Sequence, residues 1–214
     1  MCIRDRFKTH HHSLNKSLGT WLGRITSVLK YIYNRKGPLS LSINQSGGYI
    51  NWHSKHHYPN LQIYFNPLTY SITHRNKRPL LKTDKFNGFI IGYNSCRPKS
   101  LGRVALNSPN FEDAPVIDPN FLSHEEDIYD VKCAINFSKV LANTNNIKKI
   151  RNESVTHDLL NATEEEMVDH FKSNAVSIYH PCGTCKMDED PKKGVVSERL
   201  KVHGMENLWI ADAS

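Results

Sequence analysis

Apolar side chains recur at helical spacing in the segment that follows Leu18. The members of this stripe are Trp21, Leu22, Ile25, Val28, Leu29 and Ile32. Arg24 and Lys30 fall outside the stripe, and Gly37 with Pro38 ends the run. This period predicts one amphipathic helix. We expect its apolar side to face a core; attachment to a membrane surface is the alternative that its basic edge permits.

The period changes to that of β-strands after this helix. Residues 61–65, 89–93 and 103–106 are short, rich in β-formers and bounded by Pro, Asn and Gly. These features predict strands joined by loops. Gln62 and Tyr64 alternate along the first of these strands, so their side chains should share one face.

Two later helices are predicted by their first residues. Ser123 with Glu126, and Thr163 with Glu166, have the spacing of a capping box, in which a hydroxyl and a carboxylate each satisfy a free backbone amide. Apolar residues at helical spacing follow both. Strands followed by helices in this order indicate an α+β fold, an antiparallel sheet with flanking helices.

The first residues lack this patterning. Residues 1–12 are polar and irregular, and we expect residues 1–17 to form a disordered or non-native lead-in. His10, His11 and His12 have no cluster of partner ligands, so no metal site is expected there.

Charge and cysteine usage narrow the function classes. The 214-residue chain has a net charge of +7, but its basic residues are spread along the sequence without interleaved aromatics, so we expect no nucleic-acid partner. No apolar run approaches the roughly 18 residues that a transmembrane helix requires. The five cysteines form an odd, sparse set, which argues against a secreted disulfide framework and favours a reducing compartment such as the cytoplasm.

Several chemistries could use the segment SIYHPCGTCKM at residues 177–187. Cys182 and Cys185 have the spacing of a redox pair, but no helix N-terminus or βαβ pattern adjoins them to lower a thiol pKa. A zinc site would need two more ligands, and the nearest histidines, His170 and His203, form no second ligand pair.

The histidine of this segment is the third possibility. His180 precedes a proline, which holds its backbone extended and presents the imidazole from a stiff chain. An unperturbed imidazole pKa near ~6.5 suits a general base at neutral pH. From the local residues alone a structural histidine is favoured over a catalytic one, and both interpretations stay open.

Longer motifs resemble those of a known family. The segment at 177–187 is followed by GVV at 194–196 and by LKVHGMENLWIADAS at 200–214. This combination of turn, hairpin and strand resembles the carboxy-terminal signature of the glucose-methanol-choline (GMC) flavin oxidoreductases. The substrate domain of the choline and alcohol dehydrogenase branch has landmarks similar to residues 35–40, 44–48, 59–62, 97–104 and 115–122.

The resemblance implies an FAD-dependent enzyme that oxidises the CH–OH group of an alcohol. His180 matches the family's active-site histidine, which removes the hydroxyl proton while hydride passes to flavin N5. Oxygen or a quinone-like carrier would then accept the electrons. Cys182 and Cys185 become packing residues of the turn beside His180.

Further site residues follow from the same resemblance. Tyr179 is expected beside the flavin ring, and Asp212 and Ala213 are expected to approach the cofactor. Gln62 and Tyr64 are the candidates for the substrate pocket, with a polar sheet surface as the alternative.

The resemblance divides the chain into the lead-in at 1–17, a substrate-binding domain at 18–176 and the carboxy-terminal motif at 177–214. The last part would supply terminal strands of an incomplete FAD-binding α/β domain. The eleven glycines form no G-x-G-x-x-G phosphate cradle, and the family continues beyond the position of Ser214 with a second catalytic His or Asn. We therefore expect a fragment that is inactive by itself.

A non-enzymatic binding module derived from the family is the rival interpretation. Such a module should cover the apolar edge at residues 208–211. A fragment should leave that edge exposed, because the strands that cover it lie elsewhere in the longer protein.

Overall fold

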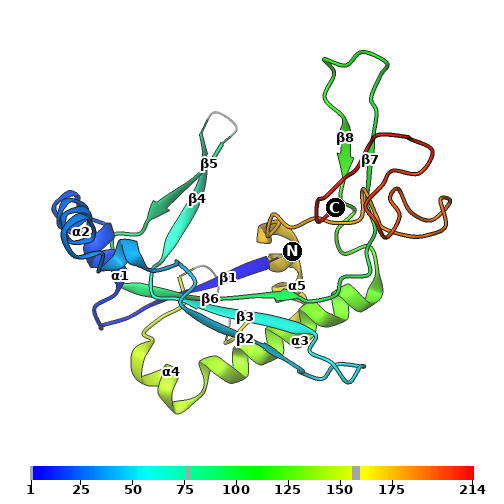
Figure 1. Cartoon of the computed structure of the whole chain (residues 1–214). Coiled ribbons are helices and arrows are strands. Elements are labelled where there is room, and N and C mark those ends of the chain that lie inside the picture. The colour runs from blue at the N-terminus through cyan, green and yellow to red at the C-terminus, as the bar shows by residue number, and fades with distance from the viewer. Residues whose placement is uncertain (1, 76–77, 156–159) are drawn as a thin grey trace. The chain divides into compact units, whose positions relative to one another are not determined.

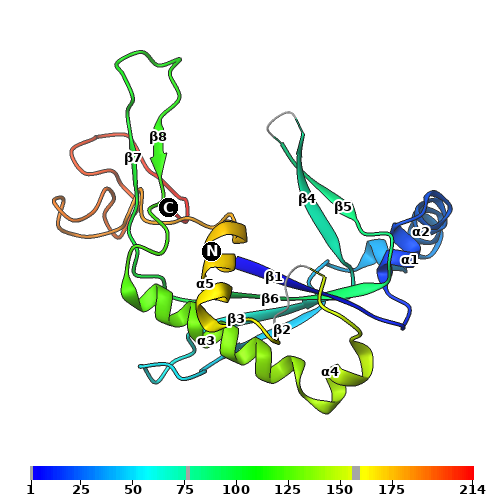
Figure 2. The same ribbon diagram turned by 180° about the vertical axis from the view of Figure 1, so that it is seen from behind.

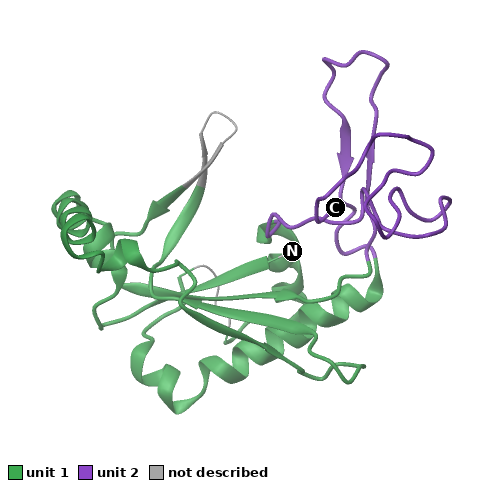
Figure 3. Ribbon diagram, in the orientation of Figure 1, with its two compact units in different colours: residues 1–99, 124–176 green, residues 100–123, 177–214 purple. Residues whose placement is uncertain are grey.

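The computed structural model describes residues 2–75, 78–155 and 160–214, with side chains described outside positions 73–80. The chain forms two compact units, residues 1–99 with 124–176 and residues 100–123 with 177–214 (Figure 3). The chain enters the second unit after residue 99, returns to the first at residue 124 and enters the second again after residue 176.

A four-stranded antiparallel sheet in the order β1-β6-β3-β2 forms the centre of the first unit (Figure 1). Its strands are β1 (Cys2–Lys8), β2 (Ser46–Ile50), β3 (Leu61–Asn66) and β6 (Gly88–Ser95). β3 and β6 confirm the strands predicted at 61–65 and 89–93. The central strand β6 is buried from Gly88 to Asn94, which explains its almost unbroken apolar sequence.

The prediction of a disordered lead-in over residues 1–17 is wrong. β1 pairs with β6 along its whole length, and Ile3 and Phe7 are buried. Ile3, Asp5 and Phe7 alternate with charged residues, which is the pattern of a half-buried strand. The helix α1 (Leu14–Leu18) also lies within the predicted lead-in.

Two helices pack on one face of the sheet, α3 (Glu125–Ala142) and α5 (Glu164–Asn174), and the short helix α4 (Asn145–Ile150) follows α3 (Figures 1 and 2). Aromatic rings fill the interface. Phe89 of β6 contacts Phe7 and Phe65, with ring centroids 5.3 and 5.4 Å apart, and Tyr93 stacks on Phe171 of α5 at 6.2 Å. Large buried aromatic surfaces of this kind dominate core energetics.

Side chains cap both of these helices, one of them as predicted. Thr163 and Glu166 form the capping box at the start of α5. At α3 the cap is His124 rather than Ser123, and its Nδ1 accepts from the Glu126 amide at 3.1 Å. An imidazole nitrogen serves here as the acceptor that a hydroxyl was expected to provide.

The other face of the sheet carries α1 and the hairpin of β4 (Tyr70–Arg75) and β5 (Arg78–Thr83), which rises from the sheet in Figure 1. Asn15 ties α1 to this side. Its Nδ2 donates to the carbonyls of Thr69 at 2.8 Å and Asp84 at 3.1 Å, and its Oδ1 accepts from the Thr69 amide at 2.9 Å. A buried amide with this many partners fixes the position of α1.

Helix α2 (Trp21–Asn34) confirms the predicted amphipathic helix but not its predicted orientation. All six members of its apolar stripe are exposed, and Ser27 is the residue of the helix that is buried. The expectation that this stripe faces a core is therefore wrong within this chain. After α2 come the turn at Gly37 and the short helix η1 (Pro38–Ser40). In the described part of the chain, no helix is long and apolar enough to cross a membrane.

The second unit contains one hairpin and an irregular chain. β7 (Arg103–Ala105), which confirms the strand predicted at 103–106, pairs with β8 (Val116–Asp118). Isolated bridges connect Met187 with Val196 and Lys201 with Trp209. The terminal strand expected near 207–214 is thus reduced to the bridge at Trp209, among the residues that the structure describes.

Asp5 of β1 makes the stability of the first unit depend on pH. It is buried on the helix side of the sheet, and this burial raises the pKa of its carboxyl to about 7. The raised pKa means that the folded state binds a proton more tightly than the unfolded chain. The folded state has its full stability below the pKa of Asp5 in the unfolded chain, which is ~4. As pH rises from there through 7, the folded state loses up to about 4 kcal/mol of its free energy of unfolding.

We therefore predict that Asp5→Asn unfolds at a higher urea concentration than the parent chain at pH 8, and at nearly the same concentration at pH 4. Asp169→Asn on the surface of α5 is the control and should change stability by less than about 0.5 kcal/mol at either pH. An Asp5→Asn effect of equal size at both pH values would contradict the assignment.

Candidate active-site turn

The segment 177–187 folds as a turn held against the last residue of the chain. The amides of Gly183 and Cys185 both donate to the carbonyl of Ser214, each at 3.2 Å. This pair of hydrogen bonds brings together two motifs that are about thirty residues apart in sequence. His180 and Tyr179 therefore lie in the same compact element as Asp212 and Ala213.

His180 is exposed at this turn. Within the described part of the chain, no hydrogen bond or ion pair of its imidazole is recorded. The preceding residue, Tyr179, has a φ of 62° and an exposed ring, and its amide donates to the Ser177 hydroxyl at 3.0 Å. A left-handed backbone is uncommon for an aromatic residue, and such strain concentrates at functional sites.

Backbone hydrogen bonds connect the end of the turn, at residues 186–188, with residues 195 and 196. Val195 donates to the carbonyl of Lys186 at 2.7 Å, and Asp188 donates to the carbonyl of Val196 at 3.0 Å. The Nε2 of His203 lies 2.8 Å from the carbonyl of Asp188. This histidine is therefore part of the support, whereas the imidazole of His180 is unconstrained.

Asp212 forms a hydrogen bond with Ser214, two residues further along the chain. Its Oδ1 accepts from the Ser214 amide at 2.8 Å. Hydrogen bonding from the Ser214 side chain, with a further contribution from its amide, lowers the pKa of the Asp212 carboxyl. The group is thus held as a carboxylate, and both Asp212 and Ala213 are exposed.

The apolar edge beside this turn is exposed. Leu208 and Trp209 are 43% and 56% exposed, and Met187, Val195 and Met205 are also exposed. A self-contained binding module would have covered this edge. The exposure agrees with the fragment interpretation, in which other strands complete the sheet.

Cys182 and Cys185 are free thiols, the first of them exposed. Within the described residues, no helix begins in the segment 177–214, so neither thiol lies at the helix N-terminus that a redox pair of this spacing requires. The described residues also contain no group of three or more potential metal ligands.

Gln62 and Tyr64 lie in the first unit, on the face of β3 opposite the aromatic core. Gln62 contacts Tyr49 of β2 and Asn94 of β6, each at 3.4 Å, and the Tyr64 hydroxyl lies against the Cys2 thiol. The predicted alternation is therefore correct. This pair belongs to the first unit and His180 to the second.

The same face of the sheet holds two residues that sequence reasoning missed. Asn94 and Tyr49 contact Gln62 only because β6 and β2 flank β3 in this register. Gly92 makes room for Tyr64, since a Cβ at that position would lie 2.1 Å from the tyrosine ring. Burial also raises the pKa of the Tyr64 hydroxyl, which keeps it protonated and able to donate.

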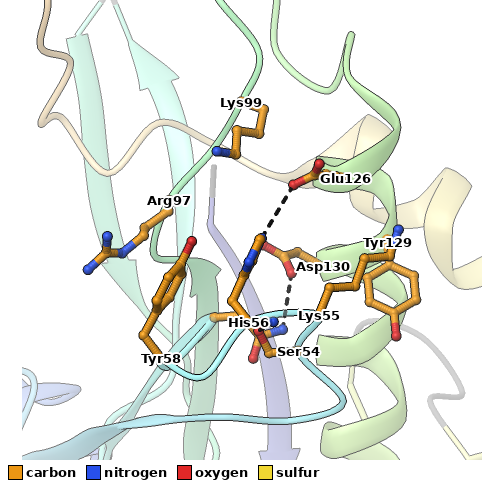
Figure 4. Close-up of a pocket in the computed structure, with 10 residues that line it drawn as sticks. Ser54, Lys55, His56, Tyr58, Arg97, Lys99, Glu126, Tyr129 and Asp130 are labelled. Carbon is orange, nitrogen blue, oxygen red and sulfur yellow. Dashed lines mark hydrogen bonds and ion pairs between the residues drawn. The ribbon is translucent and has the colours of Figure 1, made fainter.

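A separate hollow lies where α3 begins, between the loop at 51–60 and the end of β6 (Figure 4). His56 lies 3.9 Å from Glu126, and Arg97 lies over the Tyr58 ring at 4.2 Å. The cavity of about 20 Å³ has room for about one water molecule rather than an organic substrate. We interpret it as the contact that joins the loop to α3.

The second unit has exposed groups of the kind that contact a flat aromatic cofactor. These are the His180 imidazole, the Tyr179 ring and the apolar edge at Leu208 and Trp209. A glycine-rich loop that could hold the pyrophosphate is not part of the sequence.

Known proteins are similar to this chain over most of its length. Residues 98–214 match the model of a family described as GMC oxidoreductase. The alcohol dehydrogenase (acceptor) of Pseudomonas putida is 34% identical over 190 residues, which are 89% of this chain and 33% of that protein. The oxygen-dependent choline dehydrogenase of Cronobacter sakazakii is 29% identical over 194 residues, 91% of this chain and 34% of that protein. The chain thus spans about a third of the length of these relatives.

Solved structures confirm the fold. Formate oxidase of Aspergillus oryzae RIB40, in a structure described in terms of FAD modification, superimposes with a TM-score of 0.82 at 21% identity. The match covers 99% of this chain and 41% of that one. The expected antiparallel substrate-domain fold is therefore correct.

Gly194 permits the close approach that supports the turn. A Cβ at this position would lie 2.6 Å from both the amide and the Cβ of Asp188. We predict that Gly194→Ala separates the two segments, destabilises them by about 1–3 kcal/mol and speeds exchange of the Val195 and Asp188 amides in hydrogen-exchange NMR. Gly48→Ala, where a Cβ would meet nothing within 4 Å, is the control. Unchanged protection in Gly194→Ala would show that the segments are not packed this closely.

Proposed function

Because the chain belongs to the GMC oxidoreductase family, we propose that it is part of an FAD-dependent enzyme that oxidises the CH–OH group of an alcohol. The observation that carries this proposal is the turn with the exposed His180, held by two hydrogen bonds against the chain end that contains Asp212 and Ala213. The curated relatives are named for alcohol and choline oxidation, which supports a small alcohol as the substrate class.

His180 would act as the general base. A free imidazole on a stiff pre-proline backbone can take the proton from a substrate hydroxyl at one ring nitrogen and release it to solvent later. FAD, when bound, supplies a hydride acceptor for the same carbon. Removal of the hydroxyl proton makes that carbon a better hydride donor, which is the contribution of this chain to the reaction.

Asp212, Ala213 and Tyr179 would hold the cofactor. Asp212 is exposed, and its lowered pKa keeps it a carboxylate that can accept hydrogen bonds. The Tyr179 ring presents an aromatic face of the kind on which planar groups stack. The residues that would bind the phosphates belong to another part of the longer protein.

Gln62 and Tyr64 would orient the alcohol. Tyr64 stays protonated at neutral pH and can donate to the substrate oxygen, and Gln62 offers both a donor and an acceptor. Oxygen and a quinone-like carrier are both compatible with this chemistry as the electron acceptor.

The non-enzymatic binding module is the second candidate. The exposed edge at Leu208 and Trp209 argues against it, because a self-contained module would bury these side chains.

We predict that the 214-residue chain alone retains no FAD. With the pyrophosphate cradle outside the chain, gel filtration after incubation with excess FAD should remove the flavin absorbance, and FAD should not raise the thermal unfolding midpoint. Stoichiometric, stabilising FAD binding would contradict this prediction and would mean that the chain holds the cofactor without a dinucleotide motif.

The role of His180 is testable in a protein extended to the length of the relatives. His180→Ala should lower kcat for a primary alcohol by about 10²–10⁴-fold without changing the FAD content, as expected for loss of a general base. His57→Ala, in an exposed loop of the first unit, is the matched control and should keep full activity. Equal activity of the His180 and His57 variants would exclude His180 as the base.

A further inference from the structure

Helix α2 turns its apolar side away from the unit that carries it. Seven large side chains form an outer face, each between 44% and 80% exposed: Trp21, Leu22, Ile25, Val28, Leu29, Ile32 and Tyr33. At 3.6 residues per turn these positions fall within an arc of about 140°. An apolar stripe this wide normally faces a core.

The inner side of the same helix is small and polar. Ser27 is buried, and its hydroxyl donates to the Gly23 carbonyl at 2.7 Å. A Cβ on Gly23 would lie 2.1 Å from the Ser17 carbonyl oxygen, so only glycine fits against α1 there. Arg24 also ties the helix to its unit, since its side chain donates to the Leu18 carbonyl at 2.7 Å and to the Thr83 hydroxyl at 3.4 Å. The helix is thus attached on the side of Gly23, Arg24 and Ser27, and the apolar face is left for something outside the unit.

The stretch of sequence that contains α2 carries charges of a single sign. Residues 6–83 contain twelve Lys and Arg residues and no Asp or Glu. Lys16, Lys30, Arg35 and Lys36 are exposed, and Arg24 follows the other edge of the apolar arc. The exposed basic residues of α1, α2 and the turn after α2 thus accompany the outer face of α2.

We infer that α2 docks into the interface of a membrane that contains anionic lipids. The apolar arc would enter the boundary between headgroups and acyl chains, and the Lys and Arg residues at its edges would meet the lipid phosphates. Trp21 and Tyr33, at the two ends of the helix, are the aromatic types enriched at this depth.

Two other occupants fit the outer face less well. In a two-fold dimer through α2 the same face would meet itself, which places basic edge against basic edge with no acidic residue to pair. The remainder of the longer protein could cover the face, but it would need an acidic surface to match the basic edges. Anionic lipid supplies the complementary charge and the apolar phase together.

Vesicle co-sedimentation of the whole chain tests this inference. The chain should sediment with phosphatidylcholine vesicles that contain phosphatidylserine and stay in the supernatant with phosphatidylcholine alone. Raised salt should weaken the binding, because the attraction to the headgroups is screened. Equal binding to both kinds of vesicle, or binding to neither, would overturn the inference.

Paired variants locate the binding surface. Leu22→Ser with Leu29→Ser, and independently Lys30→Glu with Lys36→Glu, should each weaken vesicle binding by about tenfold or more. The matched controls are Leu106→Ser with Phe111→Ser, which changes apolar side chains that are even more exposed, and Lys148→Glu with Lys149→Glu. Both controls should bind as the parent chain does. α2 variants that bind like the controls would overturn the inference, even where the parent binds.

The alternative occupants give different results. A concentration-dependent dimer that the α2 variants dissolve would assign the outer face to a second copy. Vesicle binding that disappears when the protein is extended to the length of its relatives would assign it to the remainder of the protein. Either result would replace the membrane proposal.

Discussion

The pairing of β6 with its two neighbours is the interaction on which the rest of the first unit depends. β6 is buried along Gly88 to Asn94 and hydrogen-bonds to β1 on one side and β3 on the other. One face gives Phe89 and Tyr93 to the aromatic core under α3 and α5. The opposite face gives Gly92 and Asn94 to the group around Tyr64 and Gln62. The same backbone ladder therefore fixes both the stability of the unit and the position of its candidate substrate residues.

The second unit depends on backbone hydrogen bonds instead of a core. The turn that carries His180 is fixed by the Ser214 carbonyl and by the segments around Lys186 and Val195. Its large apolar side chains remain exposed at Leu208 and Trp209. An exposed histidine on a turn held by the backbone, beside uncovered apolar side chains, is consistent with the proposal that another part of the longer protein completes the site.

Short sequence patterns predicted those strands and helix starts that depend only on neighbouring residues. β3 and β6 follow from alternation and apolar runs, and the Thr163 capping box from four adjacent residues. The cap at α3 did not follow, because His124 takes a role usually filled by a hydroxyl. The orientation of α2 also did not follow, since the period locates an apolar stripe but not the body of the protein. Gly23 and Ser27, small residues opposite the stripe, are the signal that would have shown which side is attached.

Of the candidate site, the sequence predicted only the residues that belong to recognisable motifs. His180, Tyr179, Asp212 and Ala213 stand in a recognisable signature, and the structure brings them into one compact unit. Asn94 and Tyr49 were missed, because their contacts with Gln62 depend on strand order and register, which no short segment encodes. β1 was missed because seven residues carry a weak pattern when their partner strand is eighty or more residues away in the sequence.

The measurement that tests the central claim most directly is the rate of flavin reduction by a primary alcohol without oxygen, in the protein extended to full length. With His180 in place, the account predicts that the oxidised flavin absorbance disappears rapidly after mixing. With His180→Ala it should disappear slowly, and added imidazole should restore part of the rate by supplying the missing base. Equally rapid reduction in both proteins, with no response to imidazole, would contradict the assignment of His180 as the group that removes the hydroxyl proton.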